Sequence, residues 1–257
     1  MSVMRRCAGG ALVMLLGAAA APLGAQSAPD PHAAQPERPT VATHAGTVAP
    51  GWFEIESGVE RDHVGPDAAT LATPTLLKFG IVPRVQLDVA VTTVRPAGSA
   101  SLGVGDAGVG VKWRLADDVP LVGDFALQPS VKFPTGSAAR GTGSGTTDVS
   151  LLAISSHEFG PTALDLNVGY TKRSDASASA LWTVSTGTTI AGPLAWAAEV
   201  FGYPGLSGAP PSTGFLTGPT WTVHPWFVLD AGAIFNVAGG QPPAVYAGLT
   251  WNAGRYR

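Results

Sequence analysis

The sequence predicts an all-β protein, an antiparallel transmembrane β-barrel of about 12 strands. Charged residues make up 13% of the 257 residues, about half the roughly 25% of a soluble domain. The 33 glycines and 22 prolines disfavour long helices. From Trp52 onward, apolar and polar residues alternate, which places successive side chains on opposite faces of a strand. After residue 25 no apolar run reaches the roughly 18 residues of a spanning helix, so a helical membrane protein is excluded.

The first 25 residues have the three parts of a secretory signal peptide. Arg5 and Arg6 precede an apolar stretch over 11–21, and small residues end at Ala25, where cleavage is expected. Cys7 is the single cysteine of the chain and would leave with this peptide, so disulfides and thiolate metal sites are not expected. Residues 26–50 are rich in Ala, Pro, Thr and His without a hydrophobic period, which predicts a flexible periplasmic leader. Residues 51–257 are assigned to the barrel.

Alternation of apolar and polar residues defines each expected strand. In residues 163–171, Leu164, Leu166, Val168 and Tyr170 lie on one face and polar or small residues on the other. A dyad repeat of about ten residues with apolar side chains outward is the unit of a membrane barrel. The same pattern predicts strands over 52–61, 70–81, 84–94, 104–115, 122–133, 147–156, 163–171, 179–190, 194–203, 214–223, 226–236 and 243–252.

The connections between these strands alternate in length. Short turns with Pro, Gly or Asp are expected at 82–83, 116–121, 157–162, 191–193 and 224–225. Longer connections rich in Gly, Ser and Ala are expected at 62–69, 95–103, 134–146, 172–178, 204–213 and 237–242. Short periplasmic turns and longer external loops are typical of outer-membrane barrels, whose strand number is even.

The tryptophans provide independent support for a membrane barrel. The strand directions place six of them near the periplasmic end, where amphipathic rings prefer the headgroup level, and Trp182 near the other rim. The expected aromatic girdle consists of Trp52, Trp113, Trp182, Trp196, Trp221, Trp226 and Trp251. An aqueous β-sandwich with core tryptophans is the alternative, but it would carry more surface charge.

Strand-borne charges fall almost entirely on the polar face, which a barrel turns toward its lumen. The residues expected to line the lumen and orient a solute are Glu54, Glu56, Lys78, Asp88, Lys112, Arg114, Lys132, Asp165, Glu199 and Asp230. The bases lie on the second, fourth and fifth strands, and most acids on the sixth to eleventh and the first. This segregation would set a field across the lumen. Alternatively, these groups pair with one another and fill a narrow barrel.

No motif predicts an enzyme, a cofactor or a metal site. The G-x-G-x-x-G match at 103–108 leads into a strand instead of the helix that a dinucleotide site needs. The histidines lack ligand spacing, and only His63 lies near the outer rim, where a lipid hydrolase would need it. The formal charge of −3, with no basic face, argues against nucleic acid.

Four stretches together resemble a known family of outer-membrane barrels. They are GVGDAGVGVKWR at 103–114, SVKFPTG at 130–136, DLNVGY at 165–170 and EVFGY at 199–203. In this order and spacing they resemble the family named for the MetA pathway of phenol degradation, over about residues 51–252. The resemblance implies an outer-membrane channel for aromatic or other small organic compounds. The resemblance supplies no catalytic residues. Many outer-membrane barrels end in an aromatic residue, whereas this chain ends in Arg257, so Trp251 or Tyr256 would have to serve in that role.

These observations predict a non-enzymatic channel or transporter for small solutes in the bacterial outer membrane. The expected partners are outer-membrane lipid, the solute itself and the barrel-assembly machinery during insertion. The alternative is an occluded structural or interaction barrel whose external loops, mainly 134–146 and 204–213, bind a partner or ligand.

Overall fold

The computed structural model describes residues 30–65 and 68–257. Within this part of the chain a single 3₁₀ turn, η1 (Ala138–Arg140), accompanies twelve strands. No helix in the described ranges is long and apolar enough to cross a membrane. The expected signal peptide lies outside the described residues. The strands are β1 (Trp52–Gly65), β2 (Ala68–Val82), β3 (Val85–Arg95), β4 (Gly103–Val119), β5 (Gly123–Phe133), β6 (Asp148–Phe159), β7 (Thr162–Arg173), β8 (Ala178–Ala191), β9 (Leu194–Tyr203), β10 (Ser212–His224), β11 (Phe227–Ala238) and β12 (Ala244–Arg255).

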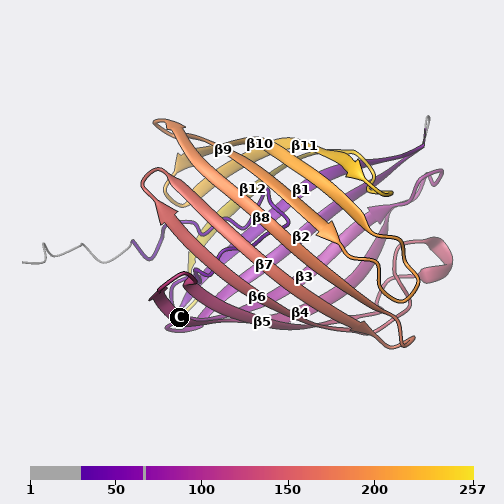
Figure 1. Ribbon diagram of the computed structural model, residues 1–257, viewed down its shortest axis with the longest axis horizontal. Coiled ribbons are helices and arrows are strands. Elements are labelled where there is room, and N and C mark those ends of the chain that lie inside the picture. Colours follow the sequence, from indigo (N-terminus) through magenta and orange to yellow (C-terminus); the bar gives the residue numbers. More distant parts are fainter. Residues whose placement is uncertain (1–29, 66–67) are drawn as a thin grey trace, which may run out of the picture.

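The strands form one closed antiparallel barrel (Figure 1), which confirms the predicted fold class. Each strand pairs with its neighbours in sequence, and β1 closes the barrel by pairing with β12 from Trp52↔Arg255 to Asp62↔Ala244. Closure leaves no unpaired strand edge, which is the condition for placing a sheet in a bilayer.

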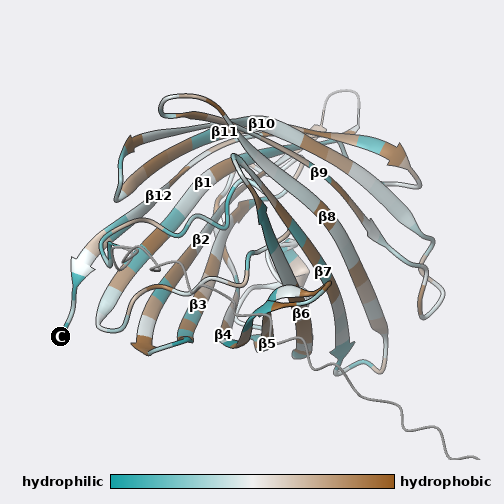
Figure 2. Ribbon diagram, turned by 60° about the vertical axis from the view of Figure 1, so that its left-hand side comes forward, coloured by the Kyte–Doolittle hydropathy of each residue, from teal (hydrophilic) through white to brown (hydrophobic). Residues whose placement is uncertain are grey.

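Alternation of residue types sets the two faces of the wall. Hydrophobic and hydrophilic residues follow one another along the strands in Figure 2. On β7, Val168 is 66% exposed on the outer face, whereas its neighbour Asn167 is 1% exposed on the inner face. The outer surface is therefore apolar and the lumen mostly polar.

All twelve expected strands are present, but several are longer at their outer ends. β1 continues to Gly65 and β2 begins at Ala68, where the sequence predicts a loop over 62–69. Their pairing extends through Asp62↔Thr70 and His63↔Ala69, because backbone groups keep pairing after the apolar dyad ends. The long connections over 96–102, 134–147 and 204–211 lie at this same end of the barrel.

Residues 30–50 form neither helix nor strand and run inside the barrel, seen as the indigo trace within the wall in Figure 1. We call them the lumen segment. Ala42, Ala45 and Val48 are at most 2% exposed. This placement differs from the expected flexible periplasmic leader. The physical reason is that the inward-facing polar groups of a twelve-stranded wall need partners, and the backbone of this segment supplies them.

Candidate functional site: the barrel lumen

Side chains of the barrel wall hold the backbone of the lumen segment. Glu54 Oε2 accepts the amide of Gln35 at 2.7 Å, and Glu56 Oε1 accepts that of Glu37 at 2.7 Å. On the opposite side, the two carboxylate oxygens of Glu199 accept the amides of Val41 and Ala42, each at 2.7 Å. An extended chain has no internal hydrogen bonds, so these acceptors take the place of a sheet neighbour.

Amide and hydroxyl side chains continue this contact toward the end of the segment. Asn167 both accepts the amide of Thr43 at 2.8 Å and donates to its carbonyl at 2.9 Å. Ser156 accepts the amide of Ala45, and Gln86 that of Val48, both at 2.8 Å. The segment is thus bound by hydrogen bonds to several strands around the wall, and its only covalent connection to the wall within the described residues is its continuation into β1.

Glu37 and Arg38 match the charges of opposite walls. The Arg38 guanidinium donates to both oxygens of Asp230 on β11, at 3.0 and 3.1 Å. Glu37 faces the basic side, in an ion pair with Lys112 and 3.8 Å from Lys78. Two adjacent residues of the segment therefore pair with an acid of one wall and a base of the opposite wall.

Lys112 is the main basic anchor of the segment and is fully buried. Its ammonium donates to Thr43 Oγ1 at 2.8 Å and to the carbonyl of His44 at 3.0 Å, besides Glu37. Burial opposes ionisation of Glu37, but the ammonium groups of Lys112 and Lys78 outweigh it and hold the pKa of Glu37 well below its usual range.

Lys78 completes the buried charge cluster. Its ammonium lies 2.5 Å from Glu54 and 2.6 Å from Glu56, and donates to the carbonyl of Gln35. Burying these ions is costly, so the cluster is stable only while every member keeps its partners.

His44 is the titratable imidazole inside the lumen segment. Burial, together with the nearby Lys112 ammonium, lowers the pKa of His44 to about 3 from 6.5. The imidazole is therefore neutral at physiological pH while the segment is seated.

Glycines let the segment approach the wall closely. Gly58 and Gly248 are paired across β1 and β12, and a Cβ at either would lie within 2.7 Å of the Arg38 guanidinium. Farther along the segment, a Cβ on Gly80 would lie 2.0 Å from the carbonyl oxygen of Ala49. Only a residue without a side chain fits at these positions.

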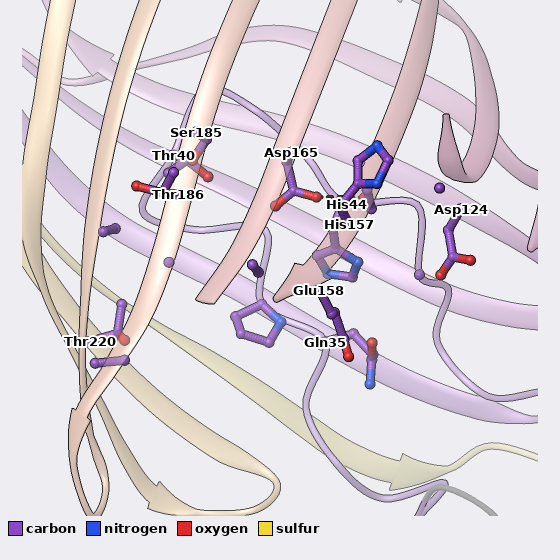
Figure 3. Close-up of a pocket in the computed structure, with 18 of the residues that line it drawn as sticks. Gln35, Thr40, His44, Asp124, His157, Glu158, Asp165, Ser185, Thr186 and Thr220 are labelled. Atoms are coloured by element: carbon purple, nitrogen blue, oxygen red, sulfur yellow. Dashed lines mark hydrogen bonds between the residues drawn. The ribbon is translucent and has the colours of Figure 1, made fainter. Parts of the chain in front are cut away.

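The seated segment leaves a cavity on each of its sides. The larger, about 830 Å³, lies at the end with the short turns, and its wall includes Asp165, His157, Glu158, Ser185 and Thr220 (Figure 3). The smaller, about 290 Å³, lies between Val41–Thr43 and the inner faces of β1–β3. Arg38 and Thr40 line both cavities. The segment therefore borders both spaces within the lumen.

The residues predicted to line the lumen all project inward, but the segment and neighbouring side chains contact most of them. Glu54, Glu56, Lys78, Lys112, Glu199 and Asp230 contact the segment directly. The carboxylate of Asp88 accepts hydrogen bonds from the side-chain amides of Gln86 and Gln128, each at 2.8 Å.

The remaining three lie nearer the two mouths of the barrel. Lys132 pairs with Asp106 and Asp148 at the outer end. Arg114 pairs with Asp117 and Asp124 at the other end and lines the larger cavity with Asp165. Asp165 and Arg114 thus border the larger cavity, and Glu56 borders the smaller one.

Four of the seven tryptophans are exposed on the outer face near the short turns. These are Trp113, Trp196, Trp221 and Trp251, at 42–55% exposure. Trp182 lies toward the other rim, with its ring over Gly202. Trp52 and Trp226 differ from the expected girdle: their rings contact His32 of the segment, with centroids 4.8 and 5.8 Å away. They pack at the barrel mouth because the segment enters there.

One sector of the lumen wall is apolar. Phe201, Leu216, Ile234 and Tyr246 project inward from β9–β12 and form a buried cluster with Ala244, against which Val41 packs. These side chains depart from the rule of polar residues inside, and they line the outer half of the barrel.

The sequence from residue 37 to residue 251 matches the family described as "Putative MetA-pathway of phenol degradation". The chain belongs to this family. No curated protein matches the sequence. Among solved structures, an outer membrane channel from Pseudomonas putida F1 is similar with a TM-score of 0.59 and 15% identity, over 80% of this chain and 97% of that one. The porin NanC is similar with a TM-score of 0.51 and 9% identity, over 77% and 98%. These likenesses show the fold.

For this member of the family, sequence reasoning missed the residues that recognise the lumen segment. Gln86, Asn167 and Asn252 are at most 1% exposed, and each contacts the segment. Their signal was available, since uncharged amides on the inward face of a strand need a partner when they are buried. The identity of that partner was not readable, because residues 26–50 carry no periodic pattern.

Proposed function

We propose that this protein is a channel of the bacterial outer membrane that passes small organic solutes, and that the lumen segment controls its opening. One observation carries the proposal: residues of the lumen segment line both of two cavities inside the barrel, and along its length this segment is held by noncovalent contacts. A segment without helix or strand of its own can leave the lumen without unfolding the wall.

The lining of the smaller cavity favours an organic solute. Methyl and methylene groups of Val41, Ala42, Pro74, Leu76 and Ala90 line it, with threonine hydroxyls among them. Its volume of about 290 Å³ is near the lower end for ligand pockets and suits a molecule with a single ring. The name of the family is consistent with phenolic solutes.

The test compares full-length protein with a variant lacking residues 30–48, by single-channel conductance in planar bilayers. We expect small, intermittent currents from the full chain and a larger, steady conductance from the deletion variant. Because the deletion exposes unpaired lumen charges, Glu199→Ala serves as a second, milder variant, with more frequent openings expected. Thr183→Val is the matched control, since this inward, buried side chain makes no hydrogen bond to the segment. If all variants fold and remain silent, the channel proposal fails, and the occluded barrel with partner-binding loops is favoured.

The solute class has a separate test. Benzyl alcohol in the bath should reduce the current through the wild-type channel in a concentration-dependent way, and glycerol should not. Leu76→Asp, which places a charge in the small cavity, should abolish this block. Equal block in both proteins would refute the organic-solute assignment and leave the channel intact.

A further inference from the structure

Two arginines and a histidine lie on the outward face of the barrel at its outer rim. Arg61 and His63 are on β1, and Arg95 ends β3. Arg61 pairs with Leu71 of β2, which in turn pairs with Arg95, so all three share one face. Two strand spacings place the arginine Cα atoms about 10 Å apart. Because Leu71 lies between the two arginines, both guanidinium groups can reach a single anion bound above Leu71.

Among the described residues, the surroundings of these side chains are apolar and contain no outward-facing acid. Val59, Val245, Leu102 and Val104 are 49–64% exposed next to them. The acids of this sector point into the lumen: Asp62 pairs with Ala244, which is 3% exposed on the inner face. The connections over 96–102 and 239–243 contain no charged residue. Nothing in the described part of this sector neutralises the two arginines.

Arg61 and His63 contact each other on the outward face of β1. Arg61 Nη1 donates to His63 Nε2 at 2.5 Å, which holds the two side chains together. Strands β1 and β3 thus place three basic side chains in one basic patch, consisting of Arg61, His63 and Arg95.

A charge on the lipid-facing side of a barrel strand is costly at the bilayer midplane but is tolerated at the interface, where the rim of the barrel lies. At the headgroup level the available anions are lipid phosphates, and clustered Lys and Arg side chains next to an apolar surface are the usual recognition element for them. We propose that this basic patch binds the phosphate groups of the outer-leaflet glycolipid, with Val59, Leu102 and Val245 against its acyl chains. The proposal rests on the outer-membrane placement under the proposed function but not on the channel activity.

The test measures binding of purified rough-type lipopolysaccharide to the full-length protein in detergent, by native mass spectrometry. Each arginine near an anionic headgroup contributes about 1 kcal/mol, or about fivefold in affinity. Arg61→Gln/Arg95→Gln should therefore weaken binding by about 25-fold, the product of two such factors. Lys172→Gln is the matched control, because Lys172 is an outward base at the same rim on β7 that stands apart from this patch and donates to the carbonyl of Ala176. Its substitution should change binding by less than about threefold, since it lies outside the patch.

Two further arms identify the ligand. Dephosphorylated glycolipid should bind wild type as weakly as intact glycolipid binds the double variant. Inorganic phosphate at millimolar concentration should leave glycolipid binding unchanged, and its displacement of the lipid would assign the patch to a free anion instead. Equal binding by the double variant and wild type would overturn the proposal. Conductance of the double variant reports separately on the channel, so the two proposals can fail independently.

Discussion

Glu37 and Arg38 are neighbours in the chain and meet opposite walls of the barrel. In an extended chain successive side chains point in opposite directions, so one dipeptide can neutralise both an acidic and a basic wall. The same geometry explains why the buried ammonium of Lys112 lies against Glu37, a residue of the segment, and not against an acid of the wall.

Charge reversal at Lys112 should expel the lumen segment. Lys112→Glu would place a second carboxylate beside Glu37 and beside the carbonyl of His44, where the Lys112 ammonium now donates four hydrogen bonds. Breaking a buried ion pair costs about 3–5 kcal/mol. We expect a steady conductance in planar bilayers similar to that of the variant lacking residues 30–48.

Lys132→Glu is the control for charge alone. Lys132 also faces the lumen but contacts Asp106 and the external loop, not the segment. Its reversal should alter ion selectivity without opening the channel. An equal effect of both reversals would show that the segment is not what Lys112 controls.

Acidification should weaken seating of the segment through His44. The seated imidazole has a pKa of about 3, whereas a released one returns to 6.5, so release binds a proton. The contribution of His44 to seating is fully present above pH 6.5 and decreases by about 1.4 kcal/mol per pH unit below it, until about pH 3. Openings of the wild-type channel should become more frequent between about pH 7 and pH 5, and His44→Gln should remove this component. A pH dependence that survives the substitution would assign it to other groups.

At the scale of elements, the wall and the lumen segment form by different rules. Each strand is specified locally by its dyad alternation, and pairing with its neighbour follows from short turns such as Val82–Val85 and His224–Phe227. The lumen segment has no such alternation of apolar and polar residues. Its course is set by acceptors on β1, β3, β6, β7 and β9, which are far apart in sequence.

A methyl group at Gly80 should displace the end of the segment. The added Cβ would meet the backbone of Val48 and Ala49, which cannot move aside as a flexible side chain would. Overpacking of this kind costs about 1–3 kcal/mol. The Val48 N–H now donates a hydrogen bond to the side chain of Gln86. In Gly80→Ala, hydrogen exchange of this amide should accelerate by one to two orders of magnitude. Gly187→Ala on β8 is the control, because nothing lies within 4 Å of its added Cβ. Unchanged exchange in Gly80→Ala would argue against close contact between the segment and β2.

At the scale of the whole molecule, closure determines the behaviour in solution. Twelve strands share one closed barrel, and their outer face presents side chains such as Val168, Phe235 and Trp113 at 50–66% exposure. An aqueous protein would not leave so much apolar surface uncovered.

The purified barrel should therefore need detergent and show heat-modifiable mobility. Unboiled samples in dodecyl sulfate should migrate faster than boiled ones, because the closed ladder resists unfolding until it is heated. The deletion of residues 30–48 should preserve this shift, since the segment adds no strand to the ladder. A protein that stays monodisperse without detergent would contradict the membrane assignment.

The family, the twelve strands, the two faces of the wall and the inward charges could all be predicted from the sequence. These properties are local: alternation at Leu164–Thr171 is complete within one strand, and bilayer physics decides which face turns outward. The ends of the strands could be predicted less well, as at β1, where pairing continues past the last apolar dyad to Gly65.

Only the tertiary structure decided what fills the lumen. Glu199 and Asn167 need partners, but a strand sequence does not say whether a partner is water, a solute or another part of the chain. Closure of the barrel brings Glu199 of β9, Asn167 of β7 and Glu54 of β1 around one axis, and residues 30–50 then find their hydrogen-bond partners there. The sequence by itself determined a barrel with a polar interior, because that property repeats every two residues. The occupant of the lumen depends on contacts of residues 30–50 with several strands, some of them 124 and 158 positions away, and the full set exists only after the barrel has closed.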